Sequence, residues 1–228
     1  LAMHSLIKND ITPDFVIMEE DDKTNEISFS NFIQSQNESK KTSWNIASIS
    51  DHTADFDYSI DKQTIGIIGT RPEGFDTCDY DSSEVTNKLN VSLVDLELED
   101  LFDEAKEVEL ETIVKTKNTV SSYLAGTEEL VQEEFNKSLS IYHGLENLKD
   151  KHNLDAFAIR CWPETFTEYG CASCGPMAMM NEKKVSCACE ADVLGGISCN
   201  ILNQMNNDPS LLVDIVDVDK SDNSLVFW

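Results

Sequence analysis

The stretch Val185-Ser186-Cys187-Ala188-Cys189-Glu190-Ala191-Asp192-Val193-Leu194-Gly195-Gly196 decides the fold class predicted for this chain. It predicts a buried strand that runs into a carboxylate, then a glycine turn, then a helix from Ile197 to Met205. A strand that is apolar on both faces is typical of a parallel sheet covered by helices. Ligands of such sheets bind beyond the carboxyl ends of the strands, so Glu190 is the first candidate functional residue.

The composition is that of a folded protein with an acidic surface. The 228 residues are 40% hydrophobic, and 43 acidic against 17 basic side chains give a net charge of −26. Nucleic acid and anionic membrane surfaces bind clustered Lys and Arg, so neither is an expected partner. No apolar run approaches the ~20 residues that span a bilayer. Seven cysteines, an odd number, favour reduced thiols in a cytoplasmic protein.

Strands and helices alternate along the chain, apart from a polar connection at residues 25–62. Strands are predicted at residues 14–18, 64–68, 91–96, 155–160, 185–189, 211–218 and 224–228. Helices are predicted at residues 29–34, 82–89, 101–107, 127–151 and 197–205. This order predicts an α/β fold, a three-layer sandwich with a mainly parallel sheet and a Rossmann-like middle domain.

Three segments are expected along the chain. Residues 1–63 are the remnant of an N-terminal α/β domain plus its connection, and residues 64–208 are the middle α/β domain. Residues 209–228 are the start of a truncated β-rich C-terminal domain. Because the first residues resemble the middle of a helix, we expect the chain to be a fragment of a longer protein.

Glu190 has a potential partner in Asp214, which follows after one predicted helix. Two successive parallel strands would bring the two carboxylates to one edge of the sheet. Such a pair can hold a hard divalent cation such as Mg²⁺ or Mn²⁺, or move a proton between adjacent carbons as general bases. The structural alternative is that Glu190 caps the next helix and Asp214 is a solvated strand end. Spacing alone favours this alternative.

Two cysteine pairs, Cys171-x-x-Cys174 and Cys187-x-Cys189, are close enough in sequence to suggest a structural zinc site. The second pair has one intervening residue inside a strand, which directs both thiols to the same face. Because buried cysteine is a common small core residue, core packing is the favoured interpretation.

Two further segments follow predicted strands, where contacts with a ligand are expected. Gly69-Thr-Arg-Pro-Glu-Gly-Phe75 lacks the pattern of a nucleotide-binding loop, although Arg71 could contact an anion or another subunit. Arg160-Cys-Trp-Pro-Glu164 offers Arg160 and Trp162 as candidate substrate-binding residues, and the indole could stack on a sugar ring. The structural alternatives are a plain turn and a packed tryptophan.

Taken in order, four stretches resemble the L-fucose/L-arabinose isomerase-like family. They are Ile65-Gly-Ile-Ile-Gly-Thr-Arg-Pro-Glu-Gly-Phe75, Ala158-Ile-Arg-Cys-Trp-Pro-Glu164, Cys189-Glu-Ala-Asp-Val-Leu-Gly-Gly-Ile-Ser198 and Leu212-Val-Asp-Ile-Val216. The resemblance runs from about residue 64 to residue 228, and the strand–Glu–x–Asp–x–x–Gly segment is its most specific part.

The resemblance implies a metal-dependent aldose–ketose isomerase that works through an enediol. In L-fucose isomerase a glutamate on this strand and an aspartate 24 residues later ligate a catalytic Mn²⁺, and Glu190 and Asp214 match that spacing (214 − 190 = 24). Both residues are therefore expected to bind Mn²⁺ or another divalent cation and to move the proton between C1 and C2. The resemblance also implies a small sugar substrate and a homo-oligomer, a trimer or hexamer.

The chain departs from the family at the third metal ligand, a histidine in the family's C-terminal domain. None of His4, His52, His143 and His152 occupies the matching position, so this ligand is expected beyond Trp228. We therefore expect this polypeptide alone to be inactive and to bind Mn²⁺ weakly. Two other hypotheses stay open: a non-catalytic carbohydrate-binding relative and a cysteine-bound zinc module.

Overall fold

The computed structural model describes residues 16–17, 27–28, 61–206, 208–222 and 224–227. The chain divides into two compact units, one of Ser59–Leu212 and one that combines Leu1–Tyr58 with Val213–Trp228. Each unit is described by itself. The predicted helix at residues 29–34 lies outside the described residues.

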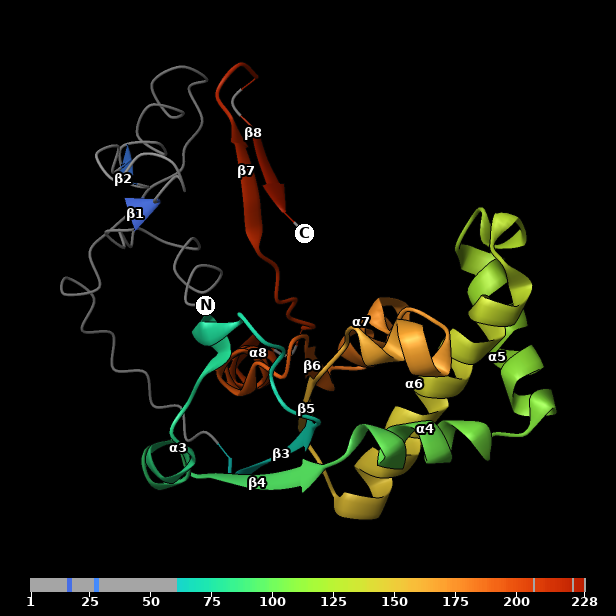
Figure 1. The fold of residues 1–228 in the computed structure, drawn as a ribbon, viewed down its shortest axis with the longest axis horizontal. Coiled ribbons are helices and arrows are strands. Elements are labelled where there is room, and N and C mark those ends of the chain that lie inside the picture. The colour runs from blue at the N-terminus through green and yellow to red at the C-terminus, as the bar shows by residue number, and fades with distance from the viewer. Residues whose placement is uncertain (1–15, 18–26, 29–60, 207, 223, 228) are drawn as a thin grey trace. The chain divides into compact units, whose positions relative to one another are not determined.

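The larger unit is built on a four-stranded parallel sheet with the strand order β4–β3–β5–β6 (Figure 1). The strands are β3 (Gln63–Ile68), β4 (Val91–Leu96), β5 (Ala156–Ile159) and β6 (Ser186–Ala188). Ile65 lies beside Leu93 on one side and Ala156 on the other, and Ala158 lies beside Ala188. The predicted α/β fold with a mainly parallel sheet is confirmed.

Helices cover both faces of this sheet and form the outer layers of the sandwich (Figure 1). They are α3 (Ser82–Leu89), α4 (Leu98–Lys106), α5 (Leu110–Tyr123), α6 (Gln132–His152), α7 (Cys174–Glu182) and α8 (Val193–Asn206), with short helical turns at η2 (Asp76–Cys78), η3 (Thr127–Glu129) and η4 (Thr165–Tyr169). Side chains alternate along each strand. Phe157 and Ile159 pack with α4, α6 and α7, whereas Ala156 and Ala158 pack with α3 and α8.

The helix after β6 begins four residues earlier than the sequence predicts, at Val193. The prediction of a glycine turn at Gly195 and Gly196 is therefore wrong, because both residues are helical. Asp192 caps this helix, since its Oδ1 accepts the N–H of Gly195 at 2.8 Å. A Cβ atom at Gly196 would lie 3.0 Å from the carbonyl oxygen of Phe157, so glycine here permits close packing of α8 on β5.

The smaller unit contains two short antiparallel pairs, β1 (Val16–Ile17) with β2 (Ile27–Ser28) and β7 (Ile215–Asp219) with β8 (Ser224–Phe227). The expectation that residues 211–218 form the next strand of the parallel sheet is wrong, because β7 pairs with β8 and belongs to the smaller unit. Within the described ranges, no helix combines the length and the apolar character of a membrane span.

Candidate active site

The order of the strands reverses at one point of the sheet. From β3 the chain goes to β4 on one side and later returns to β5 on the other side (Figure 1). In open parallel sheets, ligands bind beyond the carboxyl ends of the strands at such a reversal. Here β3 leads into Gly69, Thr70 and Arg71, and β5 leads directly into Arg160. Arg160 and Trp162, the predicted substrate-binding residues, both follow this strand.

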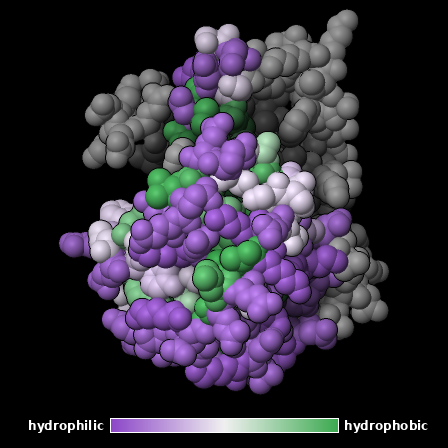
Figure 2. Space-filling model, turned by 90° about the vertical axis from the view of Figure 1, so that its right-hand side faces the viewer, coloured by the Kyte–Doolittle hydropathy of each residue, from purple (hydrophilic) through white to green (hydrophobic). Residues whose placement is uncertain are grey.

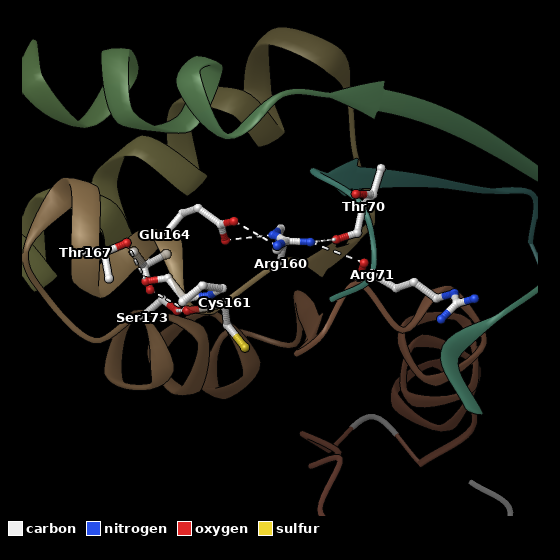
Figure 3. A network of polar contacts seen from close by, with 9 residues as sticks. Thr70, Arg71, Arg160, Cys161, Glu164, Thr167 and Ser173 are labelled. Carbon is white, nitrogen blue, oxygen red and sulfur yellow. Dashed lines mark hydrogen bonds and ion pairs between the residues drawn. The ribbon is translucent and has the colours of Figure 1, made fainter. Parts of the chain in front are cut away.

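Arg160 joins the two loops at this reversal. Its Nε and Nη2 atoms donate to the carboxylate of Glu164, both at 2.7 Å. Its Nη1 atom donates to the carbonyl oxygens of Thr70 at 3.0 Å and Arg71 at 3.2 Å. Figure 3 shows the guanidinium between Glu164 on one side and the loop after β3 on the other, with the side chain of Arg71 directed away. These contacts engage most of the five N–H donors, so a direct contact with substrate stays a prediction.

The segment that follows Arg160 is anchored by its backbone. The carbonyl oxygen of Cys161 accepts a hydrogen bond from the hydroxyl of Thr165. It accepts a second one from the hydroxyl of Ser173 at 3.4 Å (Figure 3). The hydrogen bond from Arg160 holds the pKa of Glu164 below its usual value. Trp162 lies between these anchored residues and is 46% exposed. Its indole is therefore accessible for stacking, as the prediction requires.

Glu190 lies in an unusual turn at the carboxyl end of β6. Glu190 and Ala191 both have left-handed backbone conformations, with φ angles of 60° and 53°. A residue with a Cβ atom is destabilised by about 1–2 kcal/mol in this region. The N–H of Ala191 donates to the carbonyl oxygen of Ile159 at 2.9 Å, which fastens the turn to β5. Strain of this kind is concentrated at functional sites.

The structural alternative for Glu190 was the role of helix cap, and Asp192 takes that role instead. Glu190 itself is half-buried. Asp214 is exposed and directly precedes β7, in the smaller unit. Glu190 belongs to the larger unit and Asp214 to the smaller one, so the pairing of these two carboxylates stays a prediction.

The described part of the chain contains no group of three His, Cys, Asp or Glu side chains that could hold a metal ion. The zinc hypothesis therefore has no support among these residues. Cys171 and Cys187 belong to the core between the sheet and the helices α4, α6 and α7, and Cys189 packs against it. Burial raises the pKa of the Cys171 thiol to about 11, as expected for a core residue.

Cys161 differs from the other core cysteines. A hydrogen bond with the thiol of Cys189, together with one from the N–H of Glu190, lowers its pKa to about 7, although burial opposes this change. Cys161 was not among the residues predicted from the sequence to have a function. The available signal was its place directly after a predicted buried strand, the same position that drew attention to Glu190.

Comparison with curated proteins places the chain beside sugar isomerases. It is 34% identical over 172 residues to the sulfoquinovose isomerase of Alkalicoccus urumqiensis and 27% identical over 161 residues to that of Clostridium sp. (strain MSTE9). These matches cover 72% and 71% of this chain but 37% and 36% of the relatives, so the chain spans little more than a third of their length. No protein-family model matches the chain. The relatives are sugar isomerases, as the resemblance implies, but their names are not those of L-fucose or L-arabinose isomerase.

Proposed function

We propose that the full-length protein is an aldose–ketose isomerase of carbohydrate metabolism and that sulfoquinovose or a closely related sugar is its substrate. The similarity to sulfoquinovose isomerases over 72% of the chain supports the class of reaction and the choice of sugar. The observation that carries the proposal is Glu190, a half-buried carboxylate in a left-handed turn at the carboxyl end of a parallel strand. This is a place where a carboxylate reaches a ligand.

In this proposal Glu190 acts as a general base. Conversion of an aldose to a ketose removes a proton from C2 and adds one to C1 through an enediol, which a carboxylate can catalyse. The turn that carries Glu190 is fixed on one side by the hydrogen bond from Ala191 to Ile159 and on the other by the cap of α8. A carboxylate on a fixed backbone keeps its orientation, which proton transfer requires. Asp214 is proposed as the second carboxylate.

Glu190 and Asp214 are also the residues that would hold Mn²⁺ or another divalent cation. Bound there, the metal would supply Lewis-acid polarisation of the sugar oxygens and so stabilise the enediolate charge. Carboxylate oxygens suit such a hard cation. Two carboxylates are fewer ligands than the cation accepts, so the proposal includes a third ligand, the histidine that the resemblance implies. Trp162 is the proposed stacking surface for the sugar ring.

We also propose that the full-length protein forms a homo-oligomer. The support is a set of exposed apolar side chains on α5 and in the segment between α5 and α6: Leu110, Val114, Tyr123, Leu124, Leu130 and Val131. Tyr123 and Val131 are 61% and 63% exposed. Figure 2 shows apolar surface among hydrophilic surface on the side of the molecule that carries α5. Light scattering should give a mass of several chains, and a monomeric mass would contradict the proposal.

The isomerase proposal is tested with the full-length protein, sulfoquinovose and Mn²⁺, with the ketose product followed by NMR. Removal of the metal by a chelator should abolish turnover, and added Mn²⁺ should restore it. Glu190→Gln should lower kcat by about 10²–10⁴-fold, the usual contribution of a general base, and leave the circular dichroism spectrum unchanged. Glu73→Gln is the matched control, since Glu73 is exposed in the loop after β3 at the same edge.

Two results would contradict the proposal. One is turnover by Glu190→Gln at the parental rate. The other is saturable sugar binding without turnover and without a response to Mn²⁺, which the carbohydrate-binding alternative predicts.

A further inference from the structure

The loops at the carboxyl edge of the parallel sheet contain few basic side chains. In the described part of the larger unit, the segment between β3 and α3 contains Arg71, and the segment between β5 and α7 contains Arg160. The segments between β4 and α4 and between β6 and α8 contain neither Lys nor Arg. An anionic group of a ligand at this edge therefore has two candidate partners among these loops.

The two arginines differ in how far their donors are already used. Arg160 binds the carboxylate of Glu164 and two backbone carbonyls. Arg71 makes one side-chain hydrogen bond within the described residues, from Nη1 to Asp76 at 2.8 Å, and its Nε lies 3.7 Å from Asp79. Both aspartates are strongly exposed, and exposed ion pairs contribute little to stability. The guanidinium of Arg71, itself one third exposed, is therefore the one that can accept a ligand anion.

The loop that carries Arg71 has a well-fixed backbone. The carbonyl oxygen of Arg71 accepts a hydrogen bond from Nη1 of Arg160 at 3.2 Å. Pro72 follows and restricts the backbone further. The N–H of Phe75 donates to the carbonyl oxygen of Pro72 at 3.3 Å, and Gly74 has a φ angle of 88°, as the third position of a tight turn requires. The side chain of Arg71 extends from this loop away from Arg160 (Figure 3).

Three candidate residues follow three neighbouring strands. The strands β3, β5 and β6 are adjacent in this order, and they lead into Arg71, Trp162 and Glu190. Neighbouring strands lie about 4.8 Å apart, so the ends of β3 and β6 are separated by about 10 Å. Sulfoquinovose is a glucose whose C6 carries a sulfonate, and its isomerisation takes place at C1 and C2. A sugar with its reacting carbons at Glu190 and its ring at Trp162 therefore directs C6 toward the loop after β3.

We propose that Arg71 binds the sulfonate at C6 of the sugar and makes the site specific for a hexose with a single negative charge. This inference rests on the proposed isomerase function and adds the origin of its substrate specificity. The planar fork of a guanidinium matches two oxygens of such an anion. In a chain with a net charge of −26, an anionic substrate is repelled at long range, so a basic partner at the site is required.

The two aspartates beside Arg71 limit the charge of the ligand. Asp76 and Asp79 repel any anion that approaches the guanidinium. A sulfonate has one negative charge, whereas a phosphate ester has about 1.5 to 2 at neutral pH. The larger charge is repelled more strongly, so the site favours the sulfonate over the phosphate. Glucose 6-phosphate, the same sugar with a phosphate at C6, should therefore be the poorer substrate.

The test compares sulfoquinovose with quinovose, which has a hydrogen in place of the sulfonate, and with glucose 6-phosphate. Values of kcat/KM are measured for the full-length protein with Mn²⁺, and the parent should prefer sulfoquinovose to both other sugars. Arg71→Gln should lower the ratio of kcat/KM for sulfoquinovose to that for quinovose by about 10–100-fold, the effect of losing a charged hydrogen bond. Arg71→Lys should lose less, because it keeps the charge. Dissociation constants from isothermal titration calorimetry give the same ratio for a sugar that binds without turnover.

Lys88→Gln is the matched control. It removes one positive charge and one exposed ion pair, that with Glu84, as Arg71→Gln removes the pair with Asp76. Lys88 lies near the end of α3, before β4, and so belongs to the opposite edge of the sheet. The ratio for sulfoquinovose and quinovose should therefore not change in this variant.

Three results would overturn the proposal: equal losses for sulfoquinovose and quinovose in Arg71→Gln, an unchanged ratio, or a preference of the parent for glucose 6-phosphate. Equal losses would mean that Arg71 only positions its loop. If the parent turns over none of the sugars, the proposed isomerase function fails, and calorimetry with sulfoquinovose still decides the anion site. Binding by the parent should then weaken by about tenfold or more in Arg71→Gln. No binding by the parent, or equal dissociation constants, would overturn the anion site as well.

Discussion

Glu164 and Glu146 make similar contacts in two different regions of the larger unit. At the carboxyl edge of the sheet, Glu164 accepts two N–H groups of Arg160, both at 2.7 Å. In the helical layer, Glu146 on α6 accepts a hydrogen bond from the ammonium of Lys183 at 2.6 Å and another from the hydroxyl of Tyr142 at 2.8 Å. Around Glu164 the same guanidinium also binds backbone carbonyls of the loop after β3, whereas the contacts of Glu146 join side chains of α6 to the end of α7.

The comparison of Glu164 with Glu146 shows that a polar network does not by itself identify a functional site. Both networks consist of a carboxylate, a cation and further hydrogen bonds. The network of Glu164 lies where the order of the strands reverses, and it fixes the two loops that end there. The network of Glu146 fastens α6 to α7 on one face of the sheet. Position relative to the strand ends therefore assigns the first to the candidate site and the second to stability.

The largest effect is expected for Arg160→Ala. The variant loses the paired contact with Glu164 and leaves two loop carbonyls without their donor. We expect a loss of about 2–3 kcal/mol in the free energy of unfolding, measured by urea denaturation, because hydrogen bonds to charged groups contribute most. Arg160→Lys should lose less, since it keeps the charge but not the planar fork. An unchanged midpoint for Arg160→Ala would show that the loops are held by other contacts.

The second prediction compares how a substitution in each of the two regions changes the catalytic activity. Under the proposed isomerase function, Glu164→Gln should lower kcat/KM for sulfoquinovose by about tenfold, because loss of the ion pair lets the loops at the strand ends shift. Glu146→Gln should leave kcat/KM unchanged and lower only stability. Steady-state kinetics at neutral pH checks both variants. Equal losses of kcat/KM in the two variants would remove the distinction drawn between the two regions.

A smaller effect is expected in the pH dependence of stability around Glu146. Burial opposes ionisation of this carboxylate, but hydrogen bonds from Lys183 and Tyr142 outweigh it and lower its pKa from 4.5. The pKa in the folded state thus lies below that in the unfolded state, so the contribution to stability is complete above about pH 5 and disappears as pH falls through the folded pKa. The difference in unfolding free energy between the parent and Glu146→Gln should shrink below pH 4.5. A difference that stays constant down to pH 3 contradicts this linkage.

The smallest effect is expected at the turn beside Glu190. Ala191→Gly should raise the free energy of unfolding by up to about 1 kcal/mol, because glycine has no Cβ atom to be strained at a φ angle of 53°. The matched control is Ala158→Gly in the centre of β5, where no strain is relieved and glycine should destabilise the protein. Thermal or urea unfolding measures both variants. A loss of stability in Ala191→Gly would mean that the turn is not strained.

The parallel sheet could be predicted because its strands are short, apolar on both faces and bounded by turn residues. The strands predicted at residues 64–68 and 91–96 coincide closely with β3 and β4, and helix 82–89 coincides with α3. Glu190 was chosen as a candidate by the same reasoning, since a carboxylate directly after a buried strand is visible in the sequence, and its function stays a prediction. The order of the strands in the sheet could not be predicted from the sequence. This order identifies the loops after β3 and β5 as the expected place of ligand binding.

Two helices were missed for different physical reasons. The helix α5 contains several β-branched residues of low helix propensity, and it is held by packing of Ile113 and Val120 against Leu139 of α6. The helix α7 begins with Cys174-Gly-Pro, which resembles a loop, although proline is tolerated in the first turn of a helix. In both cases tertiary contacts outweigh a local sequence signal.

The tie between Arg160 and the loop after β3 could not be predicted, because it joins residues about 90 positions apart through backbone carbonyls. Main-chain acceptors carry no sequence signal. The same limit applies to the left-handed turn of Glu190 and Ala191, since neither residue type is typical of that conformation. Asp214 was expected beside β6 on the assumption of a continuous parallel sheet, and the antiparallel pairing of β7 removes that assumption.

Because the seven cysteines differ in burial, the rate at which each is labelled can report where the protein unfolds locally. All of them belong to the larger unit, with Cys174 exposed, Cys189 partly buried and the other five buried. Cys161, Cys171 and Cys187 lie in the core between the sheet and the helices α4, α6 and α7, whereas Cys199 lies on α8. A short pulse of an alkylating reagent therefore marks only those layers that are open at that moment. Because Cys199 lies on α8 and Cys171 lies near α7, the order in which they become labelled reports which face of the sheet separates first.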